Sequence, residues 1–133
     1  MKYFLDTNMC IYYLKGAHPP LLTKMRSHNP DDIKIPAIVK AELVYGAEKS
    51  VHHKENLEKV NAFLLPFEIV PFGDAAASAY GKIRAGLEKA GSPIGPNDLL
   101  IAAAVLAENA ILVTNNEREF NRVSGLLMEN WVQ

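Results

Sequence analysis

The sequence predicts an α/β fold, a three-layer α/β/α sandwich around a central, mostly parallel sheet of four to five strands. Short apolar runs alternate with longer helical stretches along the chain, and this order favours a parallel sheet covered by helices on both faces. Residues 99–107 are consecutive apolar residues. Because such a run covers every side of a helix, that helix is expected to be buried on all sides. We expect a single domain spanning residues 1–133.

Composition and charge limit the class of protein. Apolar residues make up 49% of the chain and charged residues 22%, which is ordinary for a globular protein and excludes extensive disorder. The formal net charge is −1, so any contact with nucleic acid has to be local. The single Cys10 excludes an intrachain disulfide. Since the sequence shows neither a secretory signal nor a long apolar span, it favours a cytoplasmic protein without a membrane segment.

The first predicted strand, residues 3–5, is followed directly by an acidic residue, Asp6. Aspartate is a good helix N-cap, and the apolar residues 9–14 supply the helix that follows. Capping is therefore one role for Asp6. Its place at the carboxyl end of a strand, where open α/β folds bind their ligands, supports a functional role as the alternative.

A second acid, Glu42, lies in the second turn of a helix that Pro36 begins after the strand 33–35. Apolar residues, Tyr45 among them, leave this helix little polar surface. A buried carboxylate costs several kcal/mol unless it is paired or binds a metal. Glu42 is therefore either a structural glutamate paired with a lysine or part of a functional site.

The remaining elements follow from apolar spacing and from turn residues. His52 and His53 are adjacent, so on a helix their side chains point apart, which favours a solvated turn or helix start over a metal pair. Asp74 is expected to cap the long helix that follows it. The predicted elements are helices over 19–28, 57–64 and 75–90, strands over 68–70, 111–113 and 126–128, a turn over 29–32 and a short polar helix over 117–122.

Two further polar groups flank the buried helix. Asp98 lies in its first turn, and Asn116 follows the strand 111–113. If the helix runs down one face of the sheet and the strand returns beside it, both groups lie at the edge where Asp6 and Glu42 are expected. The sequence therefore predicts that four polar groups converge at the carboxyl edge of the sheet.

Three carboxylates around one pocket repel each other, and a hard cation is their natural counter-charge. Mg²⁺ takes oxygen ligands, uses one or two carboxylates directly and keeps several waters. Such an ion activates water and stabilises charge on a phosphoryl group. The sequence has no glycine-rich phosphate loop, no Ser-His-Asp set with plausible spacing and no Cys-His zinc spacing. Metal-assisted phosphodiester hydrolysis is the interpretation that remains.

Four stretches, in the right order and over essentially the whole chain, resemble the PIN-domain toxins of VapC type. They are LDTN at 5–8, AELVYGAEKS at 41–50, GPNDLLIAA at 95–103, and VTNN at 113–116 followed by REF. The resemblance implies a PIN-like fold and a Mg²⁺- or Mn²⁺-dependent endoribonuclease, the toxin of a type II toxin–antitoxin system. It also implies a homodimer inhibited by a cognate VapB-type antitoxin, whose C-terminal tail lies over the active site, within a larger toxin–antitoxin assembly.

The resemblance also assigns roles to residues. It makes Asp6 and Asp98 direct metal ligands, and Glu42 completes the metal site. Many relatives have a fourth acid where this chain has Asn116, so either Glu119 supplies the missing carboxylate or Asn116 coordinates through its oxygen. The residues expected to orient these carboxylates or to bind a phosphate are Thr7, Asn8 and Asn115.

The same resemblance suggests a reaction and a substrate. A water positioned by Glu42 or Glu119 would attack an RNA phosphodiester in line and leave a 3′-hydroxyl and a 5′-phosphate. Exposed loops, where bases are unstacked, are the expected targets. The stretches 45–50 and 114–120 further resemble a subgroup that cuts the anticodon loop of initiator tRNA.

Two other functions stay open from the sequence. One is a different Mg²⁺-dependent phosphoesterase, such as a small-molecule phosphatase or a DNA-directed nuclease. An aspartyl-phosphate mechanism favours a second acid two residues after Asp6, and this chain has Asn8 there. The other is a catalytically weak PIN module that binds RNA or an antitoxin. Asn116 is its only support, and the three retained acids argue against it.

Overall fold

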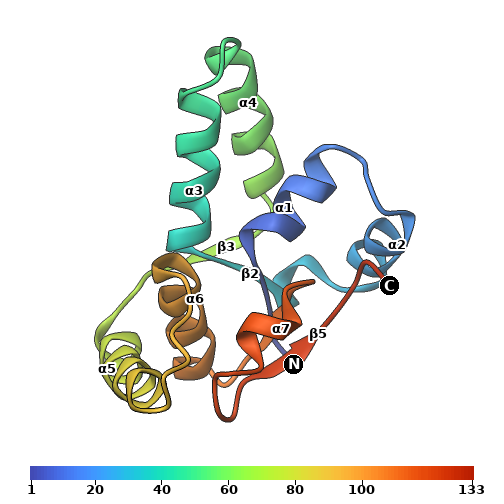
Figure 1. The fold of residues 1–133 in the computed structure, drawn as a ribbon. Helices are drawn as coiled ribbons and strands as arrows, with labels where there is room; N and C mark the ends of the chain where they lie inside the picture. Colours follow the sequence, from blue (N-terminus) through green and yellow to red (C-terminus); the bar gives the residue numbers. More distant parts are fainter.

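A computed structural model describes residues 1–133 as a five-stranded, all-parallel sheet surrounded by helices (Figure 1). The strand order across the sheet is β3-β2-β1-β4-β5, so β1 is central. The strands are β1 (Tyr3–Leu5), β2 (Ile33–Pro36), β3 (Glu68–Val70), β4 (Ile111–Val113) and β5 (Leu127–Glu129). The helices are α1 (Thr7–Leu14), α2 (Pro19–Ser27), α3 (Ala37–Glu48), α4 (His53–Leu64), α5 (Asp74–Lys89), α6 (Pro96–Ala107) and α7 (Glu117–Phe120), with a 3-10 turn η1 (Pro30–Asp32) before β2.

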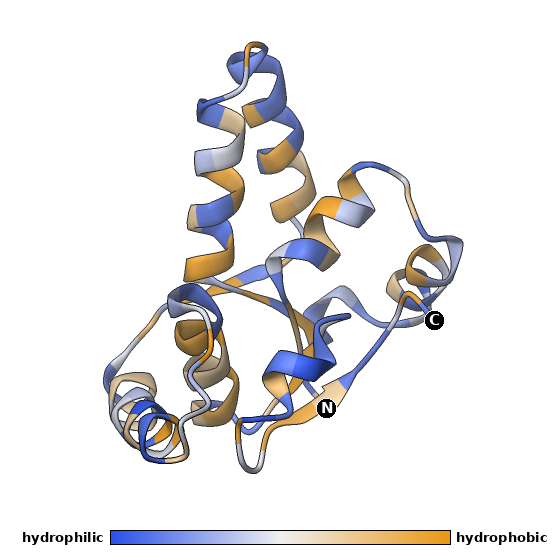
Figure 2. Ribbon diagram, viewed as in Figure 1, coloured by the Kyte–Doolittle hydropathy of each residue, from blue (hydrophilic) through white to orange (hydrophobic).

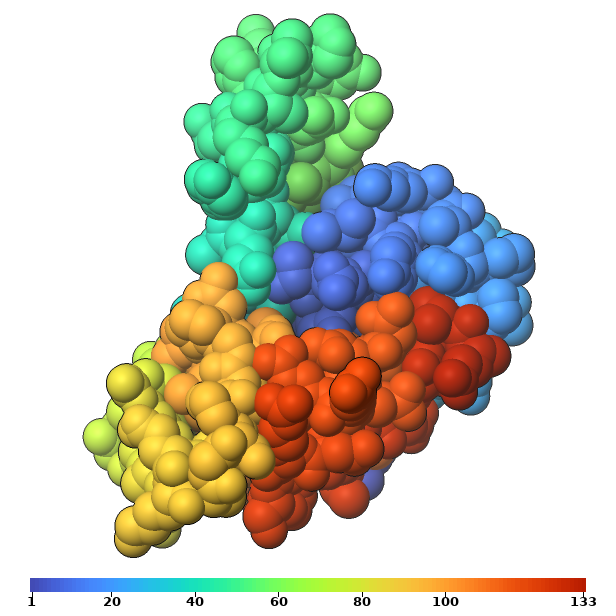
Figure 3. All heavy atoms as spheres, in the orientation of Figure 1, coloured from blue at the N-terminus to red at the C-terminus, as the bar shows by residue number.

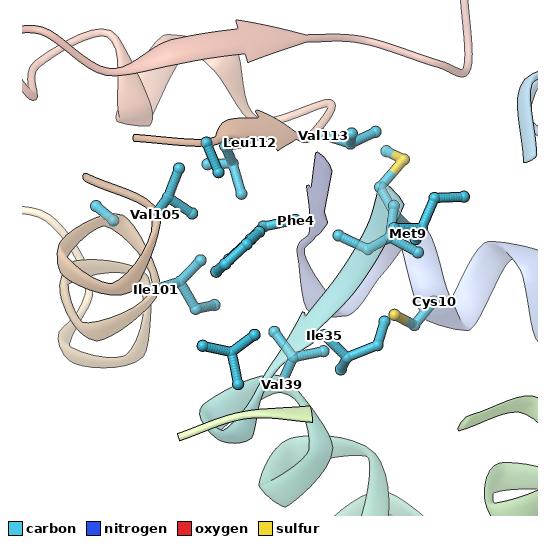
Figure 4. Packing of buried hydrophobic residues seen from close by; sticks show 14 of the residues in the cluster. Phe4, Met9, Cys10, Ile35, Val39, Ile101, Val105, Leu112 and Val113 are labelled. Atoms are coloured by element: carbon cyan, nitrogen blue, oxygen red, sulfur yellow. The ribbon is translucent and has the colours of Figure 1, made fainter. Parts of the chain in front are cut away.

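The core lies on both sides of the central strand. Phe4 of β1 is fully buried and lies among Ile101 and Val105 of α6 and Leu112 of β4, whereas Met9 of α1 lies on the other side of the strand (Figure 4). Helices cover each face of a parallel sheet, so both faces of its strands are buried. Such strands therefore consist of consecutive apolar residues. The predicted three-layer α/β/α architecture is confirmed, and the sheet is entirely rather than mostly parallel.

Helix α6 is the buried helix that the sequence predicts. Residues 101–105 are at most 3% exposed, and Figure 2 shows hydrophobic colours along this helix and along the neighbouring strands. Pro96 and Asn97 at its start are exposed, and Asp98, Leu100 and the residues of its last turn are half-buried. Because α6 begins at Pro96, its first turn carries Asp98 to the carboxyl edge of the sheet, which is the geometry that the sequence implied.

Helices α3 and α4 form a hairpin that projects from the body of the molecule (Figures 1 and 3). Helix α3 starts directly after β2, so its first two turns stay beside the sheet while its far end extends outward. The turn at the far end contains His52, and α4 begins at His53. Both histidines are exposed, which confirms the predicted solvated helix start.

Several boundaries differ from the prediction. Asp74 is the first residue of α5, and Gly73 occupies the N-cap position without a side-chain bond, so the predicted capping role of Asp74 is wrong. Strand β2 extends to Pro36 because Pro36 pairs in register with Val70 of β3, a tertiary contact that local sequence does not show. No helix is long and apolar enough to cross a membrane.

We predict that Phe4→Ala lowers the free energy of unfolding by about 3–5 kcal/mol, because it leaves a cavity between β1 and α6. Denaturant unfolding followed by circular dichroism measures this. As a control, Leu65→Ala removes a side chain that is 85% exposed, and it should change stability by about 0.5 kcal/mol at most. Similar losses from both variants would contradict the placement of Phe4 in the core.

Candidate active site

Asp6 lies at the carboxyl end of the central strand and is 4% exposed. Its backbone N–H donates to the Val113 carbonyl at 3.1 Å, and its Oδ1 accepts from the Met9 N–H at 2.9 Å as the N-cap of α1. Burial raises the pKa of Asp6; hydrogen bonds from Thr114 and Met9 partly oppose this, and the charge of Glu42 adds to it. The predicted capping role is confirmed, and it places the carboxyl group at the sheet edge.

Glu42 lies in the second turn of α3, half-buried and facing α1. Its Oε1 accepts a hydrogen bond from the Thr7 hydroxyl at 2.9 Å. The alternative of a structural glutamate paired with a lysine is wrong, since the ion pairs of the structure are Lys34–Glu68, Lys59–Glu55 and Arg84–Glu88. A neutral hydroxyl orients this carboxylate without neutralising it.

Both carboxylate oxygens of Glu119, on α7, accept hydrogen bonds. The Gly95 N–H donates to its Oε1 at 2.6 Å, and the Asn116 amide donates to its Oε2 at 2.7 Å. Desolvation by itself would raise the pKa of Glu119, but the bonds from Gly95, Asp98 and Asn116 outweigh it and hold the pKa below its usual value. Glu119 is therefore the ionised member of this part of the site.

Asp98 lies next to Glu119 across Gly95. A Cβ on Gly95 would be 3.6 Å from Glu119 Oε1 and 3.8 Å from Asp98 Oδ2, so both carboxyl groups border this glycine. Desolvation, then the hydrogen bond and charge of Glu119, and then the charges of Asp6 and Glu42 raise the pKa of Asp98 to about 7. At pH 7 Asp98 is therefore protonated in about half of the molecules, and it shares that proton with the ionised Glu119 through their hydrogen bond.

This proton sharing gives a physical reason for the amide at position 116. An aspartate there would bring a further anion against Glu119, which Asn116 instead holds with its N–H. The amide therefore fixes the orientation of Glu119 without adding to the repulsion around Asp98.

The acids open onto one cleft of about 500 Å³ between α1, α3 and the start of α6. Figure 3 shows the surface hollowed where these three segments meet. Only one cationic side chain, Lys49, lines the cleft, and none of its acids takes part in an ion pair. The lining residues are Asp6, Thr7, Asn8, Ile11, Glu42, Tyr45, Gly46, Lys49, Asn97, Asp98 and Asn116.

This donor set fits a hard divalent cation. All of its charged groups except Lys49 are carboxylates, and after burial and Glu119 the charges of Asp6 and Glu42 add to the raised pKa of Asp98. In the present arrangement no three acids lie close enough together to hold one ion. Direct bonds from one or two carboxylates, with waters between the ion and the other acids, match the preference of Mg²⁺.

The structure brings together most of the residues predicted from the sequence. Asp6, Glu42, Asp98 and Asn116 line the cleft together with Thr7 and Asn8. Glu119 lies behind them, bonded to Asn116. Asn115 does not line the cleft; its amide donates to the Tyr12 hydroxyl at 3.2 Å.

Sequence reasoning missed part of the α3 face. Tyr45 was predicted to belong to an apolar surface, but its side chain is 65% exposed and borders the cleft with Lys49. The sequence did contain a signal for this face. A spacing of three or four residues places side chains on the same side of a helix, and this spacing joins Glu42, Tyr45, Gly46 and Lys49. Gly95, whose N–H fixes Glu119, could not be found in this way, because that contact spans 24 positions in the sequence.

Comparisons with known proteins agree with this geometry. The model of the PIN domain matches residues 3–126. A Rickettsia felis protein named Ribonuclease VapC2 is 44% identical, with 98% of each chain covered. A Shigella flexneri protein named tRNA(fMet)-specific endonuclease VapC is 39% identical, again with 98% of each chain covered.

Solved structures show the same similarity. A crystal structure of VapBC2 from Rickettsia felis bound to a promoter DNA fragment matches with a TM-score of 0.93 at 42% identity, covering 98% of this chain and 99% of that chain. A structure of DNA-bound VapBC from Salmonella typhimurium also has a TM-score of 0.93, at 37% identity, with 98% of each chain covered.

We predict that Asp98→Asn stabilises the metal-free protein at pH 8. The folded-state pKa of Asp98 is raised from 3.8 to about 7, so the folded protein retains a proton that the unfolded chain has lost. That contribution is present at low pH and is lost as the pH rises through about 7. Glu119, with its lowered pKa, changes stability only at acid pH.

Thermal unfolding in EDTA at pH 5 and pH 8 tests this prediction. From pH 5 to pH 8 the free energy of unfolding of the wild type should fall by about 1 kcal/mol more than that of Asp98→Asn. This value allows for solvent screening of a half-buried group. Glu55→Gln, which removes an exposed acid of α4, is the matched control. A pH-independent difference between wild type and Asp98→Asn would contradict the raised pKa.

Proposed function

The chain belongs to the PIN-domain family and, within it, to the VapC ribonucleases, the toxins of toxin–antitoxin systems, and from this premise we propose that it is a Mg²⁺-dependent endoribonuclease that cuts initiator tRNA. The metal dependence rests on one observation: carboxylates at the end of β1, on α3 and on α6 line the same cleft, and none of them takes part in an ion pair. In this proposal residues 1–133 form one PIN domain. Mn²⁺ can replace Mg²⁺ in the reaction.

In this proposal Asp6 and Asp98 would be the ligands of the cation, and Glu42 would complete the metal site. A divalent cation held there supplies Lewis-acid activation of water and stabilises charge on the phosphoryl group. The fit rests on the three carboxylates of the cleft, which Lys49 alone faces as a cation, and on the pKa of Asp98, which desolvation raises and the neighbouring carboxylates raise further. Asn116 has a supporting role, because its amide orients Glu119. Asn8 and Asn97 line the cleft where a phosphate oxygen would lie.

Glu42 and Glu119 are the candidates for positioning the attacking water and taking its proton. Each is oriented by hydrogen bonds, Glu42 by the Thr7 hydroxyl and Glu119 by Gly95 and Asn116. Attack forms a bond from the water oxygen to phosphorus and breaks the bond to the 3′-oxygen, which takes a proton from solvent. The products are a 3′-hydroxyl and a 5′-phosphate.

Relatives supply the expectations about partners and substrate. The Rickettsia felis and Salmonella typhimurium structures are VapBC complexes, so we propose that a VapB-type antitoxin inhibits this chain by covering the cleft and that the toxin forms a homodimer. The Shigella flexneri and Salmonella typhimurium relatives are named tRNA(fMet)-specific endonucleases. A tRNA substrate would place the activity in the cytoplasm.

We predict that antitoxin-free protein cleaves bacterial RNA in Mg²⁺ and not in EDTA, and that Asp98→Asn lowers the rate constant at least about 100-fold, because it removes a ligand of the proposed cation. Gel analysis of the fragments measures this. Glu55→Gln makes the same charge change outside the cleft and should retain the wild-type rate. Metal-independent cleavage, or equal rates for wild type and Asp98→Asn, would contradict the proposal.

The substrate is tested with purified tRNAs. We expect initiator tRNA to be cut within its anticodon loop and elongator methionine tRNA to remain intact under the same conditions. Mapping of fragment ends by primer extension identifies the cut. Equal cleavage of both tRNAs would agree with a ribonuclease activity but would contradict the proposed specificity for initiator tRNA.

A further inference from the structure

An exposed aromatic ring borders the acidic cleft. Tyr45 is on α3, one turn beyond Glu42, and 65% of its side chain is exposed. It is the only exposed residue among the phenylalanines, tyrosines and tryptophan of the chain, since the others are buried or half-buried. Leaving such a ring in water forgoes the hydrophobic stabilisation that burial would give, so packing within the chain does not explain it.

Lys49 lies beside this ring and is the only cation that lines the cleft. Its Nζ is 4.9 Å from the centroid of the Tyr45 ring, a cation–π contact on one side of the ring. Because the other charged groups of the cleft are carboxylates, Lys49 is the one lining side chain that can attract a phosphate directly. The pair thus offers a flat apolar surface and a positive charge at one rim.

Gly46 keeps the space between Glu42 and Tyr45 open. Glycine inside a helix is less stable than alanine, yet a Cβ at Gly46 would meet nothing within 4 Å. Close packing therefore does not require a glycine at this position, which lines the cleft. A ligand that approaches the helix backbone beside Tyr45 would make use of that space.

We propose that Tyr45 is a stacking platform for an unpaired nucleobase next to the scissile phosphate, and that Lys49 binds a neighbouring phosphate of the same strand. Stacking on an aromatic ring together with a nearby cation is the usual way in which proteins hold single-stranded nucleic acid. A base in a duplex cannot reach the ring, so this contact selects unpaired segments. The inference rests on the proposed ribonuclease activity and specifies how its substrate is held.

Binding of a short single-stranded RNA that contains fluorescent 2-aminopurine tests the proposal. In EDTA, where no cleavage is expected, the wild-type protein should quench the base, and Tyr45→Leu should bind about 5- to 150-fold more weakly. Tyr45→Phe keeps the ring and should restore the affinity to within about twofold of wild type. Equal affinity of Tyr45→Leu and wild type overturns the proposal.

Lys49 has a matched control elsewhere on the surface. Arg84 lies over the ring of Tyr80 on α5, also four residues away and also exposed, but outside the cleft. Lys49→Gln should weaken RNA binding and reduce its salt dependence, whereas Arg84→Gln should change neither. Equal effects of the two variants would show general charge attraction and overturn the role given to Lys49.

Gly46→Ala separates ligand binding from protein stability. The added methyl group should raise the melting temperature, because alanine favours a helix, and should weaken RNA binding by filling the space beside Tyr45. Unchanged RNA affinity would overturn the role of that space. If Tyr45→Leu loses antitoxin affinity but keeps the RNA affinity of the wild type, the stacking role of Tyr45 is overturned.

Cleavage assays distinguish this inference from the proposed function. With single-stranded RNA and Mg²⁺, Tyr45→Leu should raise KM, and its kcat should stay closer to wild type than that of Asp98→Asn. If wild type cleaves RNA and Tyr45→Leu has the same KM, the stacking role fails while the nuclease stands. If wild type does not cleave RNA at all, the proposed function itself fails.

Discussion

The parallel pairing of β1 with β4 is the constraint on which the site depends. Leu5 pairs with Val113 in register, and the next residue, Asp6, donates its N–H to the Val113 carbonyl. This pairing ends β1 and β4 at the same level. Asp6 then caps α1, and the segment after β4 turns through Thr114 and Asn116 towards α7. Two elements distant in the sequence thus deliver polar groups to one point.

The electrostatics of the cleft oppose the stability of the fold. Asp6 and Asp98 have raised pKa values because they are desolvated near other carboxylates, and no cation of the chain pairs with them. Thr7, Gly95 and Asn116 contribute neutral donors that orient the acids without cancelling their charge. Such an arrangement suits a site that gains its counter-charge from a bound ion.

Much of the fold was predictable, because apolar runs and their interruptions are local signals. The run 99–107 predicted a buried helix, and α6 is buried. Asp6 was predictable as a cap and as a site residue, because strand ends in parallel sheets mark ligand sites. In contrast, Gly73 at the N-cap of α5 was not predictable, because the neighbouring Asp74 is the better capping residue type. The exposure of Tyr45 was indicated only by its helical spacing from Glu42, while the apolar residues around it suggested burial. The bond between Gly95 and Glu119 is likewise a tertiary contact.

The central claim is that the carboxylates at this sheet edge bind a catalytic divalent cation. Isothermal titration calorimetry of Mn²⁺ into metal-free protein at pH 7, in buffers of different ionisation enthalpy, tests it most directly. We expect saturable binding that releases protons, because the pKa of Asp98 is raised to about 7 and a bound cation favours its ionised form. Asp6→Asn should abolish that binding. Absence of binding in the wild type, or binding that Asp6→Asn leaves unchanged, would contradict the claim.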